Sequence, residues 1–337
     1  MSTLTVRDTV ARRRKSDGGA FGGLPWTVLR LHRTALLLWA AVLLAGVGVL
    51  IWMYAIGADA QAGLGPCAMP ATDTLPSCST LEALNADETY GIGLGLTGIA
   101  LSCLMFPVAA WAGAALIGRE LESGTAQLAW TQSVTPMRWL TAKLAVPAAL
   151  LTTGATLLVL LNVWARRDDN PNLVGDWYNS SVFVSTGPVA VASVLAGLAL
   201  GALAGLAVKK TLPAAGVAFA ATLVLYNVLD WYRPSLWPAD TVTGRAALHL
   251  PRSSLVLEHG AVTDTGERVG NNLACIDSDS AADIKACMTR SGLTDFWATH
   301  HPESHFWPLQ LMESGVLLAV AGLATVIAFR LLRRRTP

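Results

Sequence analysis

The chain has 337 residues, of which 53% are hydrophobic and only 14% are charged. Soluble globular domains usually carry about 25% charged residues, so the composition excludes an ordinary soluble domain. The formal net charge of +1 carries little information, and the distribution of charge along the chain carries more.

Six apolar segments are long enough, or nearly so, to cross a bilayer, which takes about 20 helical residues. They span residues 34–57, 91–116, 144–165, 187–208, 213–229 and 308–329. We therefore expect an all-α polytopic membrane protein with six transmembrane helices. Its expected parts are a basic tail with an interfacial helix (1–33), five spans (34–230), an external segment (231–307) and a sixth span with a basic end (308–337).

Positive charge is shared unevenly between the two sides of this arrangement. Sixteen of the 24 Lys and Arg residues fall on the side of the two termini, and the other eight are spread over nearly twice as much chain. Cytoplasmic loops carry an excess of Lys and Arg. Both termini are therefore expected to be cytoplasmic, in a bacterial cytoplasmic membrane.

The first outer loop and the start of the second span have distinct compositions. Residues 58–90 contain five acidic residues and no Lys or Arg, and residues 93–98 read GLGLTG. The latter matches the dinucleotide-binding fingerprint, which needs a preceding strand and a polar phosphate site. Because it lies in an apolar helix of membrane length, we interpret its glycines as small residues for helix packing.

The polar stretch 117–143, between the second and third spans, has the most specific pattern in the chain. Gly118 is placed to end the second span. Arg119, Glu120 and Glu122 then bring charge to the wet surface of the membrane. The alternative interpretation is an ordinary polar hairpin between two membrane helices.

The second half of this stretch predicts a short helix and a new span. After Gly124, residues 125–130 are expected to be helical, with Leu128 as the apolar anchor. Thr135 and Pro136 then start the third span, because threonine caps helices and proline is tolerated in the first helical position.

The fourth span carries Gly197, Gly201 and Gly205 at four-residue spacing. Such a stripe lets helix backbones approach closely. We expect it to lie against another helix, within the subunit or across a dimer. Lys209 and Lys210 then form a minimal inner turn before the fifth span.

The five cysteines fit the same topology. Cys67 and Cys78 fall in the first outer loop, Cys275 and Cys287 in the last, and Cys103 lies alone in the second span. Paired cysteines on the oxidising side predict two disulfides, Cys67–Cys78 and Cys275–Cys287. Metal ligation is the alternative, although neither pair has the close spacing of a zinc knuckle.

The external segment 231–307 is the only outer segment large enough for a small folded domain. Ser280 is expected to cap a helix over residues 281–290. Three histidines and a glutamate cluster near its end: His300, His301, Glu303 and His305. They form either a metal site or a polar turn at the membrane surface, and we assign no metal to them.

Several kinds of chemistry have no motif in this sequence. A phosphate-binding loop of the GxxxxGK[ST] type does not occur, so the chain is not expected to hydrolyse ATP. The first five predicted spans contain no Asp, Glu, Lys or Arg, which argues against an ion-coupled carrier. Glu313 lies about one turn inside the sixth span, where it either makes an interior polar contact or reaches the interface.

The order of residues in the stretch 117–143 resembles the intracellular coupling loop of the ABC type-2 permease family, the membrane half of ATP-driven exporters. The similarity rests on RELESGT at 119–125, TQSVT at 131–135, the Arg-Trp pair at 138–139 and a lysine before the next span. The six spans and the external segment between the last two also agree. FWPLQ at 306–310 resembles actinobacterial members at the start of the last span.

This resemblance implies a permease subunit that forms a dimer with an identical or related copy. Each copy would rest its coupling loop on a separate ABC ATPase, two copies of which bind ATP and Mg²⁺, while this chain holds no cofactor. Membrane lipids surround the permease, and no nucleic acid partner is expected. The implied ATPase-coupling residues are Arg119, Glu120, Glu122, Gly124, Thr125, Gln132 and Arg138.

The implied function is export of an amphipathic or lipid-like small molecule, drug or peptide. Two rival classes are compatible with the sequence. One is a membrane-embedded enzyme that uses the external histidines and carboxylates. The other is a non-transporting sensor with a disulfide-bonded ectodomain.

Overall fold

The computed structural model describes residues 33–63, 81–132, 134–166, 174–270, 275 and 281–335. The basic tail with its predicted interfacial helix lies outside the described residues, as do Cys67 and Cys78. Six helical stretches are long and apolar enough to cross a membrane, and each overlaps one predicted segment. The structure confirms a mostly helical, multi-pass membrane protein.

The first span is α2 (Arg33–Gly63). The second combines α3 (Leu81–Ile99), a π-helical segment η1 (Ala100–Leu104) and α4 (Met105–Glu122). After the short helix α5 (Thr125–Gln132), the third span is α6 (Pro136–Ala165). The short helix α8 (Ser180–Ser185) precedes the remaining spans α9 (Pro188–Val208), α10 (Thr211–Tyr232) and α13 (Phe306–Arg335).

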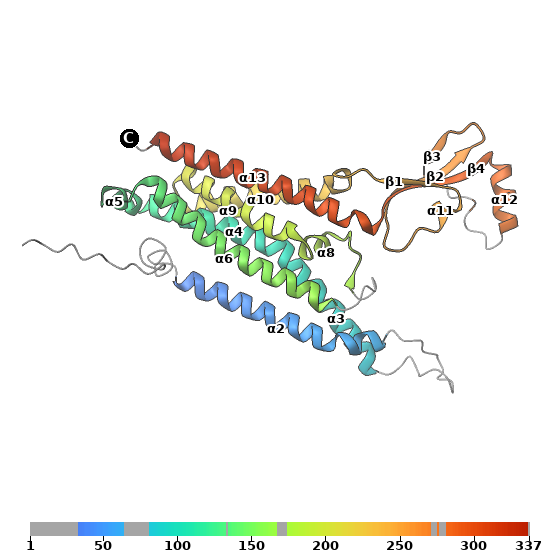
Figure 1. Cartoon of the computed structure of the whole chain (residues 1–337), viewed down its shortest axis with the longest axis horizontal. Coiled ribbons are helices and arrows are strands. Elements are labelled where there is room, and N and C mark those ends of the chain that lie inside the picture. The colour runs from blue at the N-terminus through green and yellow to red at the C-terminus, as the bar shows by residue number, and fades with distance from the viewer. Residues whose placement is uncertain are drawn as a thin grey trace, which may run out of the picture.

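The two ends of the helix bundle are different (Figure 1). The short helix α5, the start of α2 and the C-terminal end of α13 lie at one end, and a β-sheet lies at the other. We call these the α5 end and the sheet end. Arg335, in the last turn of α13, donates a hydrogen bond of 2.5 Å to the carbonyl of Leu206 near the end of α9. The C-terminal ends of α13 and α9 therefore meet at the α5 end.

Helix α9 is the centre of the bundle, because α4, α6, α10 and α13 all pack against it. Its sequence is apolar on every side, which is typical of a helix that is buried all round. It ends at the predicted turn, where Lys209 adopts a left-handed conformation with φ of 60°. This single residue lets α10 begin at Thr211.

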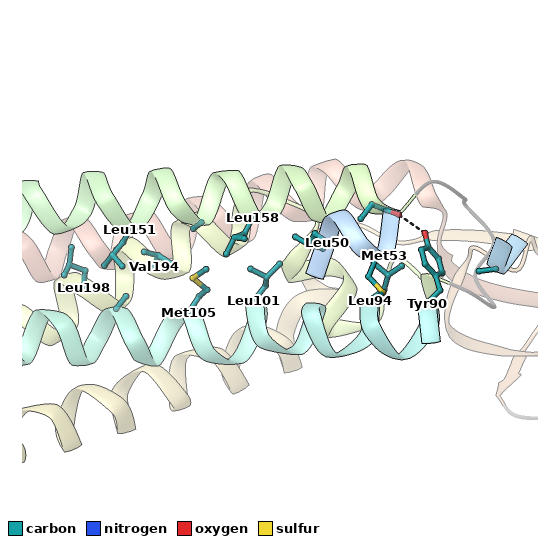
Figure 2. Close-up of a cluster of buried hydrophobic side chains, with 14 residues drawn as sticks. Leu50, Met53, Tyr90, Leu94, Leu101, Met105, Leu151, Leu158, Val194 and Leu198 are labelled. Atoms are coloured by element: carbon teal, nitrogen blue, oxygen red, sulfur yellow. Dashed lines mark hydrogen bonds between the residues drawn. The ribbon is translucent and has the colours of Figure 1, made fainter. Parts of the chain in front are cut away.

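The buried cluster beside α9 joins the first three spans (Figure 2). Leu94 of α3 and Leu158 of α6 are among its members. The hydroxyl of Tyr90 donates a hydrogen bond of 2.8 Å to the carbonyl of Ala165, drawn as a dashed line in Figure 2. This bond ties the second span to the end of the third.

Two of the three glycines of GLGLTG serve helix packing, as predicted, whereas a Cβ atom added at Gly95 would meet no atom within 4 Å. A Cβ atom at Gly93 would lie 2.9 Å from the Cε atom of Met53 on α2, and one at Gly98 would lie 3.4 Å from the carbonyl oxygen of Ser181. The first distance is shorter than van der Waals contact allows, and the second is at the lower limit of ordinary contact. Gly93 and Gly98 therefore mark helix contacts, and Gly95 does not.

The second span continues past Gly118, so the prediction that this residue ends the span is wrong. A Cβ atom at Gly118 would lie 3.1 Å from the Cα atom of Thr211, which shows why glycine is present here. The helix instead ends at Glu122, and Gly124 follows with φ of +75°. A left-handed glycine is the usual helix terminator.

A four-stranded antiparallel sheet forms most of the segment between α10 and α13. It contains β1 (Asp240–Thr243), β2 (Leu255–Thr263), β3 (Arg268–Gly270) and β4 (Leu293–His301), in the order β1-β4-β2-β3. A folded segment was predicted here from the sequence, but its strands were not. The short elements η2 (Arg233–Ser235), α11 (Arg245–Leu248) and η3 (Glu303–His305) complete it.

The predicted helix of this segment is present as α12 (Ala281–Arg290). The predicted disulfide Cys275–Cys287 is also present, with its Cα atoms 5.5 Å apart. Both cysteines pack with Leu293 and Phe296 of β4 in one small apolar core. The disulfide and this core hold α12 against the sheet.

Candidate functional site

The short helix α5 is attached to the bundle by its small and aromatic residues. Ala126 is fully buried, and the ring of Trp130 packs edge-on against Trp139 of α6 with centroids 5.6 Å apart. Leu128, by contrast, is 60% exposed. The prediction that Leu128 anchors the helix is wrong, and this leucine faces away from the bundle.

Glu120 does not extend into solvent as the sequence suggested. Its carboxylate forms an ion pair with Lys143 and accepts a hydrogen bond of 2.8 Å from Nε1 of Trp139. The side chain of Lys143 is only 5% exposed, and a buried ammonium needs such a partner. Glu120 therefore links the end of α4 to the first turns of α6, on either side of α5.

Glu122 links the same end of α4 to another span. Its Oε2 atom accepts hydrogen bonds from the backbone N–H of Thr211 at 2.9 Å and from the Thr211 hydroxyl at 2.7 Å. A carboxylate satisfies the free N–H groups at a helix start and interacts favourably with the helix dipole. Glu122 thus caps α10 from a different helix.

The other predicted coupling residues frame α5. Thr125 begins it, and its hydroxyl forms a hydrogen bond of 2.9 Å with that of Ser123. Arg119, Gln132 and Arg138 are exposed. Together with Leu128 they give this end of the molecule an accessible surface of one apolar and three polar side chains, which we call the α5 surface.

The glycine stripe of α9 packs against α4 within the subunit. A Cβ atom at Gly197 would lie 2.6 Å from the carbonyl oxygen of Phe106, and one at Gly205 would lie 3.1 Å from that of Ala114. The contact is reciprocal, because a Cβ atom at Gly113 of α4 would lie 2.8 Å from the backbone nitrogen of Ala202. The two backbones touch along most of their shared length.

At the sheet end, a buried ion pair joins the last two spans. Nε and Nη2 of Arg233 lie 2.8 and 3.3 Å from the two carboxylate oxygens of Glu313, and Nη1 lies 2.9 Å from Asp230. The guanidinium also sits over the ring of Phe183, 4.4 Å from its centroid. Glu313 is 2% exposed and makes the interior contact. The sequence pattern did not predict Arg233 as the partner of Glu313, although a lone arginine just after the fifth span was an available signal.

The clustered histidines contact one another and the backbone. Nε2 of His301 lies 2.9 Å from the carbonyl oxygen of Pro234, so this nitrogen carries a proton and donates it. Nδ1 of His301 then accepts from Nδ1 of His305, 3.0 Å away, whose Nε2 lies 3.6 Å from Asp240. Among the described residues, no three His, Cys, Asp or Glu side chains converge as metal ligands do. His300 and His301 are buried at the end of β4, and His305 lies in η3.

This histidine network predicts a pH dependence of stability. Burial, together with repulsion from His305 and His300, lowers the pKa of His301 from its ordinary value of 6.5, although the Pro234 carbonyl and Asp240 oppose this. The folded chain then binds fewer protons than the unfolded chain as the pH falls through 6.5. We expect the thermal unfolding midpoint of the detergent-solubilised protein to fall between about pH 7 and about pH 5.5.

The control for this expectation is a pair of matched histidine substitutions. His301→Gln removes the titrating group and should flatten the pH dependence, whereas His249→Gln, at an exposed position, should leave it unchanged. An equal pH dependence in wild type and His301→Gln contradicts the assignment.

Comparison with known proteins places the chain in a family. Residues 26–233 match the family described as ABC-2 membrane transporter related. The match includes the first five spans and α5, and it stops at Arg233, before the sheet and α13. No curated protein and no solved structure matches. Because the match covers more than half of the chain, this multi-pass membrane protein belongs to the ABC-2 membrane transporter related family.

Proposed function

We propose that the chain is the permease subunit of an ATP-driven exporter and that it contacts its ATPase through the α5 surface. The family membership supports the role of permease and an ABC ATPase as partner in general. The observation that supports the rest is the exposure of Leu128, which is 60% exposed on a short helix where Ala126 is buried and Ala129 and Trp130 are half-buried. Protein interfaces combine an apolar core with a polar, solvent-accessible rim.

The contacts behind α5 suit it to transmit movement. Glu120 connects the end of α4 to Lys143 and Trp139 of α6, and Glu122 connects it to the start of α10. A displacement of α5 therefore acts on three spans at once. ATP binding favours one arrangement only if the ATPase contacts α5 differently in its two states.

The proposed assembly has two permease copies and two ATPase copies, with α5 on the cytoplasmic side. The positive-inside distribution supports this orientation, and the basic last turn of α13 shares the α5 end. The chain has no phosphate-binding loop, so ATP and Mg²⁺ belong to the partner. The apolar spans favour an amphipathic or lipid-like cargo, moved outward.

The test is Leu128→Asp in the reconstituted complex with the ATPase. Because Leu128 is exposed, the variant should insert and fold with an unchanged unfolding temperature. Burying a leucine side chain contributes about 1.5–3 kcal/mol, so affinity for the ATPase should fall about tenfold or more. We expect transport to fall with it, measured as ATP-dependent flux of a fluorescent amphiphile from vesicles.

The matched control is Leu257→Asp on β2, another exposed leucine outside the spans, at the opposite end of the molecule. It should leave ATPase affinity and flux unchanged. Wild-type affinity in Leu128→Asp contradicts the assignment of α5. A substitution of Glu120 is a less informative test, because it also removes the counter-ion of the buried Lys143.

A further inference from the structure

Basic side chains from two segments that are far apart in the sequence lie together at the α5 end (Figure 1). Four exposed arginines come from the C-terminal end of α13, and two exposed lysines come from the turn between α9 and α10: Arg330, Arg333, Arg334, Arg335, Lys209 and Lys210. The hydrogen bond from Arg335 to the carbonyl of Leu206 fixes the end of α13 against the last turn of α9, three residues before Lys209. We call these six residues the basic cluster.

The described part of the chain offers this cluster little negative charge. None of the six residues forms an ion pair with another described residue. Glu122 interacts electrostatically with Lys210, but its carboxylate already accepts the hydrogen bonds of Thr211. Glu120 is paired with the buried Lys143. The basic cluster therefore keeps a net positive charge among the described groups and attracts anions.

One face of α13 changes from apolar to basic just before the helix ends. Leu323, Ile327, Arg330 and Arg334 follow one another at spacings of four, three and four residues, which places them on the same face. Leu323 is 62% exposed and Ile327 is 41% exposed inside the span, so this face contacts lipid. At a rise of about 1.5 Å per residue, Arg330 lies about 10 Å beyond Leu323, which is less than the thickness of one leaflet, about half of 30 Å.

The start of α10 has the same order of polarity. Leu212 is 72% exposed, lies in the span that begins at Thr211, and comes two residues after Lys210. The basic cluster is thus bordered by lipid-facing apolar side chains on two helices. Leu128, by contrast, belongs to a short helix outside the spans. The position of the basic cluster is that of lipid head groups, whereas the α5 surface is placed for a protein partner.

We propose that the basic cluster binds the phosphate-bearing head group of an anionic phospholipid in the leaflet at the α5 end, with an acyl chain along Leu323 and Ile327. Groups of four to eight Lys and Arg residues directly beside a transmembrane helix are typical of anionic lipid binding. An acidic protein surface matches the charges but not the exposed leucine and isoleucine beside them. Binding of the lipid requires neither ATP nor an ATPase, so it is tested independently of transport.

The experiment is a lipid titration of the purified full chain in detergent, with bound lipids counted by native mass spectrometry. The probe is dioleoyl phosphatidylglycerol, and dioleoyl phosphatidylcholine is the comparison lipid with the same chains. A third arm adds millimolar inorganic phosphate to the protein with phosphatidylglycerol bound. We expect the first phosphatidylglycerol to bind at least tenfold more tightly than phosphatidylcholine. Phosphate should not displace it, because phosphate lacks the acyl chains, whereas high salt should weaken it.

Matched pairs of arginine substitutions locate the site. Each basic residue near an anionic lipid contributes about fivefold to affinity, so Arg330→Gln with Arg334→Gln should raise the half-saturating concentration of phosphatidylglycerol about 25-fold. Arg245→Gln with Arg290→Gln removes the same charge from exposed positions at the sheet end and should leave it unchanged. Arg330→Lys with Arg334→Lys keeps the charge and should stay within about threefold of wild type. Equal unfolding temperatures without added lipid confirm that the variants are folded.

Four outcomes overturn the proposal. Equal affinity for the two lipids shows that the head group is not recognised. Equal losses in the glutamine pairs at the two ends show an effect of overall charge only. Displacement by inorganic phosphate shows a site for free anions. Unchanged phosphatidylglycerol binding in Arg330→Gln with Arg334→Gln, together with weaker binding of the ATPase, shows that the basic cluster belongs to the protein contact.

Discussion

Gly201→Leu is expected to prevent the bundle from assembling. A Cβ atom at this position would overlap the carbonyl oxygen of Ala110 and lie 2.9 Å from the backbone nitrogen of Ala114. Both are backbone atoms of α4, so no side chain can move aside, and the whole helix must separate from α9. Overpacking by a few methylenes costs about 1–3 kcal/mol even where side chains can adjust. We expect the upper end of this range or more.

The measurement is the yield of monodisperse protein on size exclusion, followed by thermal unfolding of any folded fraction. Gly322→Leu is the matched control, because Gly322 lies in α13 and a Cβ atom added there would meet no atom within 4 Å. It should be neutral or slightly stabilising, since leucine is a better helix former than glycine by about 0.5–1 kcal/mol. Similar yields for the two variants contradict the close α4–α9 contact.

Glu313→Gln is expected to destabilise the sheet end of the bundle. Arg233 is 6% exposed, and the substitution removes its buried counter-charge. Breaking a buried ion pair by removing one partner costs about 3–5 kcal/mol, because the other charge stays buried without compensation. We expect a large fall in the unfolding temperature, measured in detergent at neutral pH.

Two further variants separate the charge from the packing at this position. Asp230→Asn removes the 39% exposed partner of Arg233 and should cost about 1 kcal/mol or less. The double variant Arg233→Met with Glu313→Leu should recover most of the loss, because an apolar pair of similar volume often replaces a buried ion pair without penalty. A double variant as unstable as Glu313→Gln shows that shape, and not the unpaired charge, is responsible.

The candidate site shows how far local sequence signals reach. Thr135 and Pro136 predicted the start of α6 correctly, and the Thr135 hydroxyl accepts the backbone N–H of Arg138 at 3.4 Å. The sequence correctly predicted that Glu120 and Glu122 lie at the end of the second span. It did not predict their contacts with other helices. Glu120 forms an ion pair with Lys143, 23 residues away, and Glu122 accepts a hydrogen bond from Thr211, 89 residues away. Such pairings depend on which helices are neighbours, and the local pattern does not contain that information.

The sequence by itself determined the six spans, the short helix after Gly124, the helix over 281–290 and the presence of a close helix contact at the glycines of α9. Each follows from local physics: the length of an apolar run, a helix cap, or the absence of a side chain. Only the tertiary structure decided that α4 is the partner of that stripe, that Gly118 is a contact and not a stop, and that Arg233 pairs with Glu313. It also decided the sheet, because its strands pair β1 with β4 across more than 50 residues. Partners of this kind are chosen by packing between distant segments, which a single run of sequence cannot specify.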